Sequence, residues 1–91
     1  MKQSQRERLN KTRFDALRID AQAGLTRARI ASQAPARSDK RCRNQVNARR
    51  AYDSVLAFSS RMNLNPADAR DITERLRRLK LALQELGEPL P

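Results

Sequence analysis

Residues 65–86 read NPADARDITERLRRLKLALQEL, and this stretch predicts an amphipathic helix with well-marked ends. Its apolar residues alternate in spacing between three and four positions, which is typical of a helix that packs along a narrow seam. The seam consists of Ala69, Ile72, Leu76, Leu79, Leu83 and Leu86. Asn65 is a favourable N-cap, Pro66 suits the first helical position, and Gly87 favours a left-handed C-cap. We therefore expect a helix over about residues 66–86.

Another helix with a matching seam is predicted directly before residues 66–86. Ser38 is a suitable N-cap for a helix over about residues 39–62, and Pro35 lies in the loop that precedes it. The seam of this helix consists of Ala48, Ala51, Val55, Phe58 and Met62. Because so few residues separate the two helices, they must lie side by side and antiparallel, as a helical hairpin.

A third, basic helix is expected near the N-terminus, over about residues 5–30. Its apolar face is thin and includes a glycine, Gly24, so we expect it to be the least stable of the three. That face consists of Phe14, Leu17, Ala21, Leu25 and Ala28. The basic helix and a linker that starts at Ala31 make up residues 1–37, and the hairpin makes up residues 38–91, within one domain overall.

The predicted fold class is all-α, with two ways of completing its core. The hairpin seam buries too little apolar surface to offset the conformational entropy lost by ordering two helices. In one arrangement the basic helix packs on the hairpin through the off-seam residues Cys42, Val46 and Leu56, giving a three-helix bundle. In the other, two hairpins associate into a dimeric helical bundle.

The excess of positive charge lies in the first part of the chain. The whole sequence has a net charge of +10 and a pI near 11.4. Up to Arg50 there are 14 Lys or Arg against 4 Asp or Glu, whereas from Ala51 onward the numbers are 6 and 6. The basic part should therefore attract polyanions, and its boundary falls inside the second predicted helix.

Arginine stripes on the helices predicted over residues 5–30 and 39–62 suit a phosphate backbone, because a guanidinium group makes bidentate contacts with phosphate oxygens. On the N-terminal helix the candidate contacts are Lys11, Arg18 and Arg29 on one side of the apolar face and Arg6, Arg13 and Arg27 on the other. On the helix over residues 39–62 they are Lys40, Arg43, Arg50 and Arg61. The three aromatic residues are Phe14, Tyr52 and Phe58, and two of them fall at expected core positions. Stacking on unpaired bases is therefore disfavoured, and a duplex or structured nucleic acid is expected.

The residue types argue against catalysis. The chain has no histidine, and its single cysteine, Cys42, is expected to be a buried or half-buried structural residue. Asp71 and Glu74 lie four residues before Arg75 and Arg78, so we expect surface ion pairs there and not a carboxylate site. With only two glycines the chain has no phosphate-binding glycine loop. We expect no enzyme activity, cofactor, metal or small-molecule substrate.

Two hypotheses for function follow from these patterns. The first is a small, basic, nucleic-acid-binding accessory or regulatory protein that contacts phosphates. The second is a protein–protein interaction module, an adaptor or small inhibitor, whose seam or basic face binds an acidic protein surface. Either form is compatible with a homodimer. The single cysteine suits a reducing compartment, and the sequence has no apolar run as long as a membrane span and no signal-peptide pattern, so we expect a cytoplasmic location. Binding of the basic helix to a membrane surface is a third option, disfavoured by the absence of tryptophan and by the small apolar face.

Overall fold

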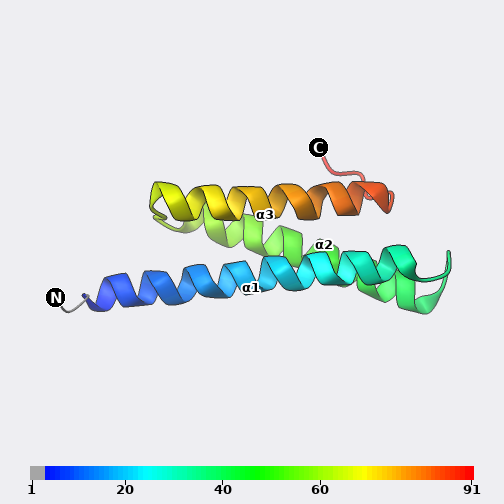
Figure 1. Ribbon diagram of the computed structural model, residues 1–91, viewed down its shortest axis with the longest axis horizontal. Helices are drawn as coiled ribbons and strands as arrows, with labels where there is room; N and C mark the ends of the chain where they lie inside the picture. The colour runs from blue at the N-terminus through cyan, green and yellow to red at the C-terminus, as the bar shows by residue number, and fades with distance from the viewer. Residues whose placement is uncertain (1–3) are drawn as a thin grey trace.

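The computed structural model describes residues 4–91, and in that part of the chain it consists of three helices and their connections (Figure 1). Helix α1 spans Gln5–Gln33, α2 spans Asp39–Arg61, and α3 spans Pro66–Glu85. Successive helices run in opposite directions, so α1 and α3 point the same way and α2 returns between them. The predicted all-α fold is confirmed, in its three-helix form.

The helix ends follow the local chemistry of the sequence. The hydroxyl of Ser38 accepts a hydrogen bond from the Arg41 amide at 3.1 Å, and the side-chain oxygen of Asn65 accepts one from the Asp68 amide at 2.8 Å. Both residues are therefore the N-caps that the sequence predicts. After α3, Gly87 adopts a φ of 94°, a left-handed conformation that glycine accepts without a steric penalty.

Helix α1 is longer than expected at its C-terminal end. The predicted linker from residue 31 to 37 is wrong at its start, because residues 31–33 continue the helix and Ala31 is completely buried. The guanidinium of Arg41 also donates to the carbonyl of Ala31 at 3.3 Å, which ties the end of α1 to the start of α2. The helix ends at Gln33, shortly before Pro35, because a proline disfavours helical geometry in the residue that precedes it.

All three helices contribute to one elongated core, which forms two adjoining clusters. The first cluster contains Leu17, Ala21, Val55, Ile72 and Leu76, and the second contains Ala28, Ala48, Leu79 and Leu83. The two predicted hairpin seams thus face α1 as well as each other. Helix α1 also packs more extensively on α2 than α3 does, so the C-terminal hairpin is not a separate unit.

Small residues allow α1 and α2 to come very close. Gly24 of α1 is buried, and a Cβ atom at this position would lie only 2.8 Å from the Cβ atom of Ala51 on α2. The same atom would lie 2.9 Å from Cδ2 of Leu79, which reaches this contact from α3. Real Cβ atoms do not approach so closely, so only glycine fits where the three helices meet.

The expected contact of α1 with off-seam residues of α2 is wrong. Cys42 is exposed, Val46 is 42% exposed and Leu56 is 46% exposed. Because the buried residues of α1 between Ala21 and Ala31 are small, this helix lies directly over the seam itself and needs no second apolar face on α2. The off-seam residues are therefore left at the surface.

Phe58 was also assigned to the wrong environment by the seam pattern, since 57% of it is exposed. On a helix, Phe58 and Tyr52 lie about 60° to either side of Val55, which is completely buried. Tyr52 packs against both core clusters, whereas Phe58 packs against neither. The buried side of α2 is therefore turned toward Tyr52. Met62, at the end of the seam, is partly buried and packs against the first cluster.

Replacing Gly24 with alanine is expected to destabilise the bundle. Alanine favours a helix over glycine by about 1 kcal/mol. Its methyl group would, however, collide with Ala51 and Leu79, and overpacking of this kind costs about 1–3 kcal/mol. We expect the free energy of unfolding to fall by about 1 kcal/mol, measured by urea denaturation with circular dichroism detection.

The double variant Gly24→Ala/Ala51→Gly tests whether the loss comes from this contact. Removing the Ala51 methyl group restores the space, so a double-mutant cycle should give a favourable coupling of about 1 kcal/mol. Ala23→Gly, at an exposed position of α1, measures the backbone effect of glycine alone. A Gly24→Ala variant that is more stable than the wild type would contradict the close approach.

Candidate functional site

All ten basic residues predicted to bind a polyanion are exposed. They are Arg6, Lys11, Arg13, Arg18, Arg27, Arg29, Lys40, Arg43, Arg50 and Arg61. Among residues 4–91, the only one of the ten that forms an ion pair is Arg18, with Asp15 at 3.5 Å. Its guanidinium also lies 6.0 Å from the centre of the Phe14 ring. The other nine carry charge that no described carboxylate neutralises by direct contact.

A groove between α1 and α2 brings two of these arginines together. Arg27 of α1 and Arg50 of α2 line a hollow of about 270 Å³, and its other lining residues are Asp20, Ala23, Gly24, Ala51 and Ser54. Most of these residues are small because the two helices meet here at the Gly24–Ala51 contact. The result is a shallow groove with a guanidinium group from each helix.

Helix register extends this groove into a longer basic face. Arg6 and Arg13 precede Arg27 by multiples of seven residues, which is close to a whole number of helical turns. On α2, Arg43 lies seven residues before Arg50, and Arg61 lies three turns after it. We call the six residues Arg6, Arg13, Arg27, Arg43, Arg50 and Arg61 the α1–α2 face.

Three of the remaining predicted contacts point elsewhere. Arg29 lines a separate groove between α1 and α3, where Arg78 and Glu85 also lie. Lys11 lines a hollow of about 440 Å³ between the first half of α1 and the α2–α3 connection, together with the carboxylates of Glu7, Asp15 and Asp68. Arg18 is held by Asp15. Helical register places Lys40, in the first turn of α2, near the α1–α2 face, so the ten residues do not form one surface.

The positive charges of α3 are largely neutralised within that helix. Arg75 pairs with Asp71, and Arg78 pairs with Glu74 at 3.3 Å, as the sequence predicts. Arg77 adds two hydrogen bonds to the Glu74 carboxylate, at 2.8 and 3.0 Å, which the i,i+4 rule did not predict. Chiefly because of the bonds from Arg77, the pKa of Glu74 falls from 4.5 to about 2.

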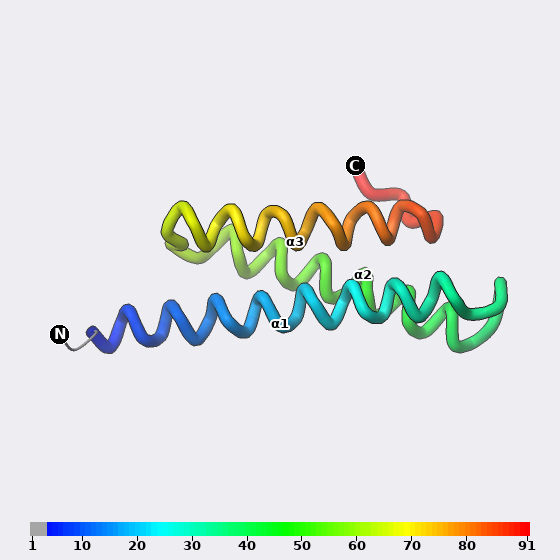
Figure 2. The backbone as a smooth tube through the Cα atoms, in the orientation of Figure 1, coloured from blue at the N-terminus to red at the C-terminus, as the bar shows by residue number. Residues whose placement is uncertain are grey.

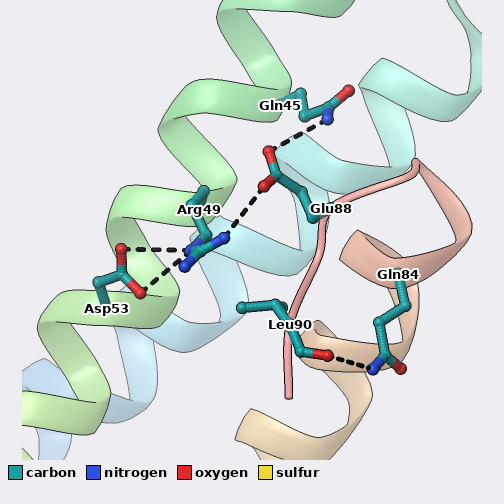
Figure 3. Close-up of polar contacts among 6 residues, drawn as sticks. All are labelled: Gln45, Arg49, Asp53, Gln84, Glu88 and Leu90. Carbon is teal, nitrogen blue, oxygen red and sulfur yellow. Dashed lines mark hydrogen bonds and ion pairs between the residues drawn. The ribbon is translucent and has the colours of Figure 1, made fainter.

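The C-terminal tail occupies a further arginine of α2 (Figure 3). Glu88 accepts hydrogen bonds from Gln45 at 3.1 Å and from Arg49 at 3.0 Å. Arg49 also donates to both oxygens of Asp53, and these contacts raise the pKa of its guanidinium, the Asp53 bond most of all. Sequence reasoning missed the contact with Glu88 because this residue lies 39 residues from Arg49. Arg49 is therefore held by structural contacts.

Other kinds of site find little support in the described residues. Cys42 is exposed, so the prediction of a buried or half-buried cysteine is wrong. Residues 4–91 contain no group of three or more His, Cys, Asp or Glu residues that could hold a metal ion. Within the same range, no helix combines the length and the apolar character needed to cross a bilayer.

The comparisons with known proteins give no family and no relative. The chain matches no protein-family model, no curated protein and no solved structure. Function must therefore be argued from the distribution of charge and exposed side chains.

A titration of Glu74 tests the charge compensation of α3. Carbon-13 NMR should place the pKa of its carboxyl group near 2, against an ordinary value of 4.5. Because this pKa is lowered in the folded chain, the stabilisation by Glu74 is present above about pH 4.5 and is lost as the pH falls toward about 2. Arg77→Leu should raise the pKa while Arg78 still holds it below the ordinary value. A midpoint near 4.5 in the wild type would contradict the pairing.

Proposed function

We propose that this protein is a small accessory or regulatory protein that binds nucleic acid through the phosphates, with the α1–α2 face as its contact surface. The observation that carries the proposal is that six arginines lie exposed along two adjacent helices with no ion pair among residues 4–91. An arginine already held by a carboxylate must give up that partner to bind phosphate. The six residues of this face have no such partner to lose.

The dimensions of the face suit an extended phosphate backbone. From Arg6 to Arg27 helix α1 rises about 32 Å at about 1.5 Å per residue, which matches about nine base pairs of duplex at about 3.4 Å each. Each arginine that contacts a phosphate releases condensed counterions, so binding is driven by entropy and weakens with salt. Asp20 interrupts the face beside Arg27 and locally reduces its charge.

An acidic protein surface is the alternative partner, since it would meet the same uncompensated charge. We favour nucleic acid because an extended row of guanidinium groups matches a repeating phosphate, whereas protein interfaces carry most of their binding energy in a few buried anchors. The single free cysteine suits a reducing compartment, so the proposal includes a cytoplasmic location. No catalytic step is proposed for the protein.

Neutralising the α1–α2 face should weaken binding and reduce its salt dependence. The variant Arg27→Gln/Arg43→Gln/Arg50→Gln removes three exposed charges without touching the core. The slope of log affinity against log salt should become less steep by about 2.7, since each lost duplex phosphate contact contributes about 0.9. Fluorescence anisotropy with a labelled random duplex, over a range of salt concentrations, measures both quantities.

The matched control is Arg70→Gln/Arg77→Gln/Arg78→Gln, which removes the same number of charges from α3. Arg77 and Arg78 already pair with Glu74, and Arg70 donates to the carbonyl of Pro66. This control should change the salt slope by less than one unit. Equal losses in the two variants would show that net charge alone matters, and wild-type binding that is independent of salt would exclude the phosphate mechanism.

A further inference from the structure

Phe58 is an exposed aromatic residue that the core does not use. It is 57% exposed, and it belongs neither to the two core clusters nor to the partly buried residues packed against them. It lies seven residues after Ala51, and therefore on nearly the same side of α2 as the contact with Gly24. A side chain in this direction would be covered if α1 continued alongside α2.

Phe58 is uncovered because α2 runs obliquely between its neighbours. In Figure 2, α2 lies beside α1 near the α1–α2 connection, and it lies beside α3 near the α2–α3 connection. The chain covers α2 at one end of this course but not at the other. Where α2 has left α3, the tail of the chain covers it, with Glu88 bonded to Arg49 and Leu90 packed on the second cluster. Where α2 leaves α1, no described segment covers Phe58.

The surroundings of Phe58 are those of the α1–α2 face. Arg61 follows one turn later on α2, and Ser54, one turn earlier, lines the groove that contains Arg27 and Arg50. Along the axis of α2 the phenyl ring therefore lies between Arg50 and Arg61, beside their row and about 60° around the helix from Arg61. Phosphate binding alone gives this aromatic ring no role.

We infer that Phe58 is a stacking platform for an unpaired base of a nucleic acid whose phosphates follow the α1–α2 face. The inference rests on the proposed function and narrows its ligand to a single strand, loop or bulge. Charge favours this occupant over a second copy of the chain, because two copies joined through Phe58 would bring their arginine faces together. It also replaces the sequence-based expectation of a duplex, which depended on Phe58 being part of the seam.

The test compares variants of Phe58 for binding a single strand and a duplex of the same length. The probes are a labelled 16-nucleotide oligothymidylate with one central 2-aminopurine and a 16-base-pair random duplex. For Phe58→Ala we expect affinity for the single strand to fall roughly tenfold, the usual size of one stacking contact, with duplex affinity changed less than twofold. The wild type should quench 2-aminopurine fluorescence, and Phe58→Ala should not.

Two further variants separate stacking from apolar contact and from folding. Phe58→Trp keeps an aromatic face and should bind the single strand like the wild type, whereas Phe58→Leu keeps apolar volume only and should behave like Phe58→Ala. Leu56→Ala removes another exposed apolar side chain, 46% exposed and on nearly the opposite side of α2, and should change neither affinity. All variants should unfold thermally at the wild-type temperature, because neither residue belongs to the core.

Several outcomes would overturn the inference. Unchanged single-strand affinity of Phe58→Ala, wild-type behaviour of Phe58→Leu, or equal losses for the single strand and the duplex would each exclude base stacking at Phe58. A dimer in sedimentation that Phe58→Ala converts to a monomer would assign the residue to a second copy. Binding of the duplex with no role for Phe58 would leave the proposed function standing, whereas a wild-type protein that binds neither probe would overturn both.

Discussion

The close contact between Gly24 and Ala51 is the constraint on which the arrangement of this molecule depends. Because Gly24 has no side chain, α1 and α2 approach so closely that a Cβ atom would not fit there, and Leu79 of α3 completes the same junction. The contact places Arg27 and Arg50 on either side of one groove. A larger residue at position 24 would separate the helices, weaken the core and move these two charges apart. Packing and the proposed binding surface therefore depend on one glycine.

Helix α2 does not follow either neighbour along its whole length. It runs obliquely from the side of α1 to the side of α3 (Figure 2). The C-terminal tail covers the region where α2 has left α3, through Glu88 and Leu90. Phe58 lies where α2 leaves α1, and there the ring stays exposed. The same oblique path thus explains why the C-terminal tail covers one region of α2 and why an aromatic residue is left uncovered in another.

The sequence predicts local features of this fold better than contacts between distant residues. Helix boundaries depend on residues within one turn of each other, and the caps at Ser38 and Asn65 are found as expected. Core seams are also well predicted where the side chains are large, as in α3. The end of α1 and the environment of Phe58 were missed for opposite reasons. Ala31 is too small to give a strong apolar signal. Phe58 gives a strong apolar signal, but the path of α2 leaves its ring outside the core.

The candidate site shows the same limit in its electrostatics. The sequence places the excess positive charge before Ala51 and predicts the ion pairs of Arg75 and Arg78, but it does not predict that Arg49 is neutralised while the arginines of the α1–α2 face are not. In the structure α3 compensates much of its charge locally, through pairs such as Glu74 with Arg77, and Arg49 is held by Asp53 and Glu88. The contact with Glu88 depends on where the tail lies, which no local pattern encodes. What distinguishes the α1–α2 face is therefore not the number of its arginines but their lack of acidic partners. Uncompensated charge, and not net charge, is the property that makes this face available to a phosphate backbone.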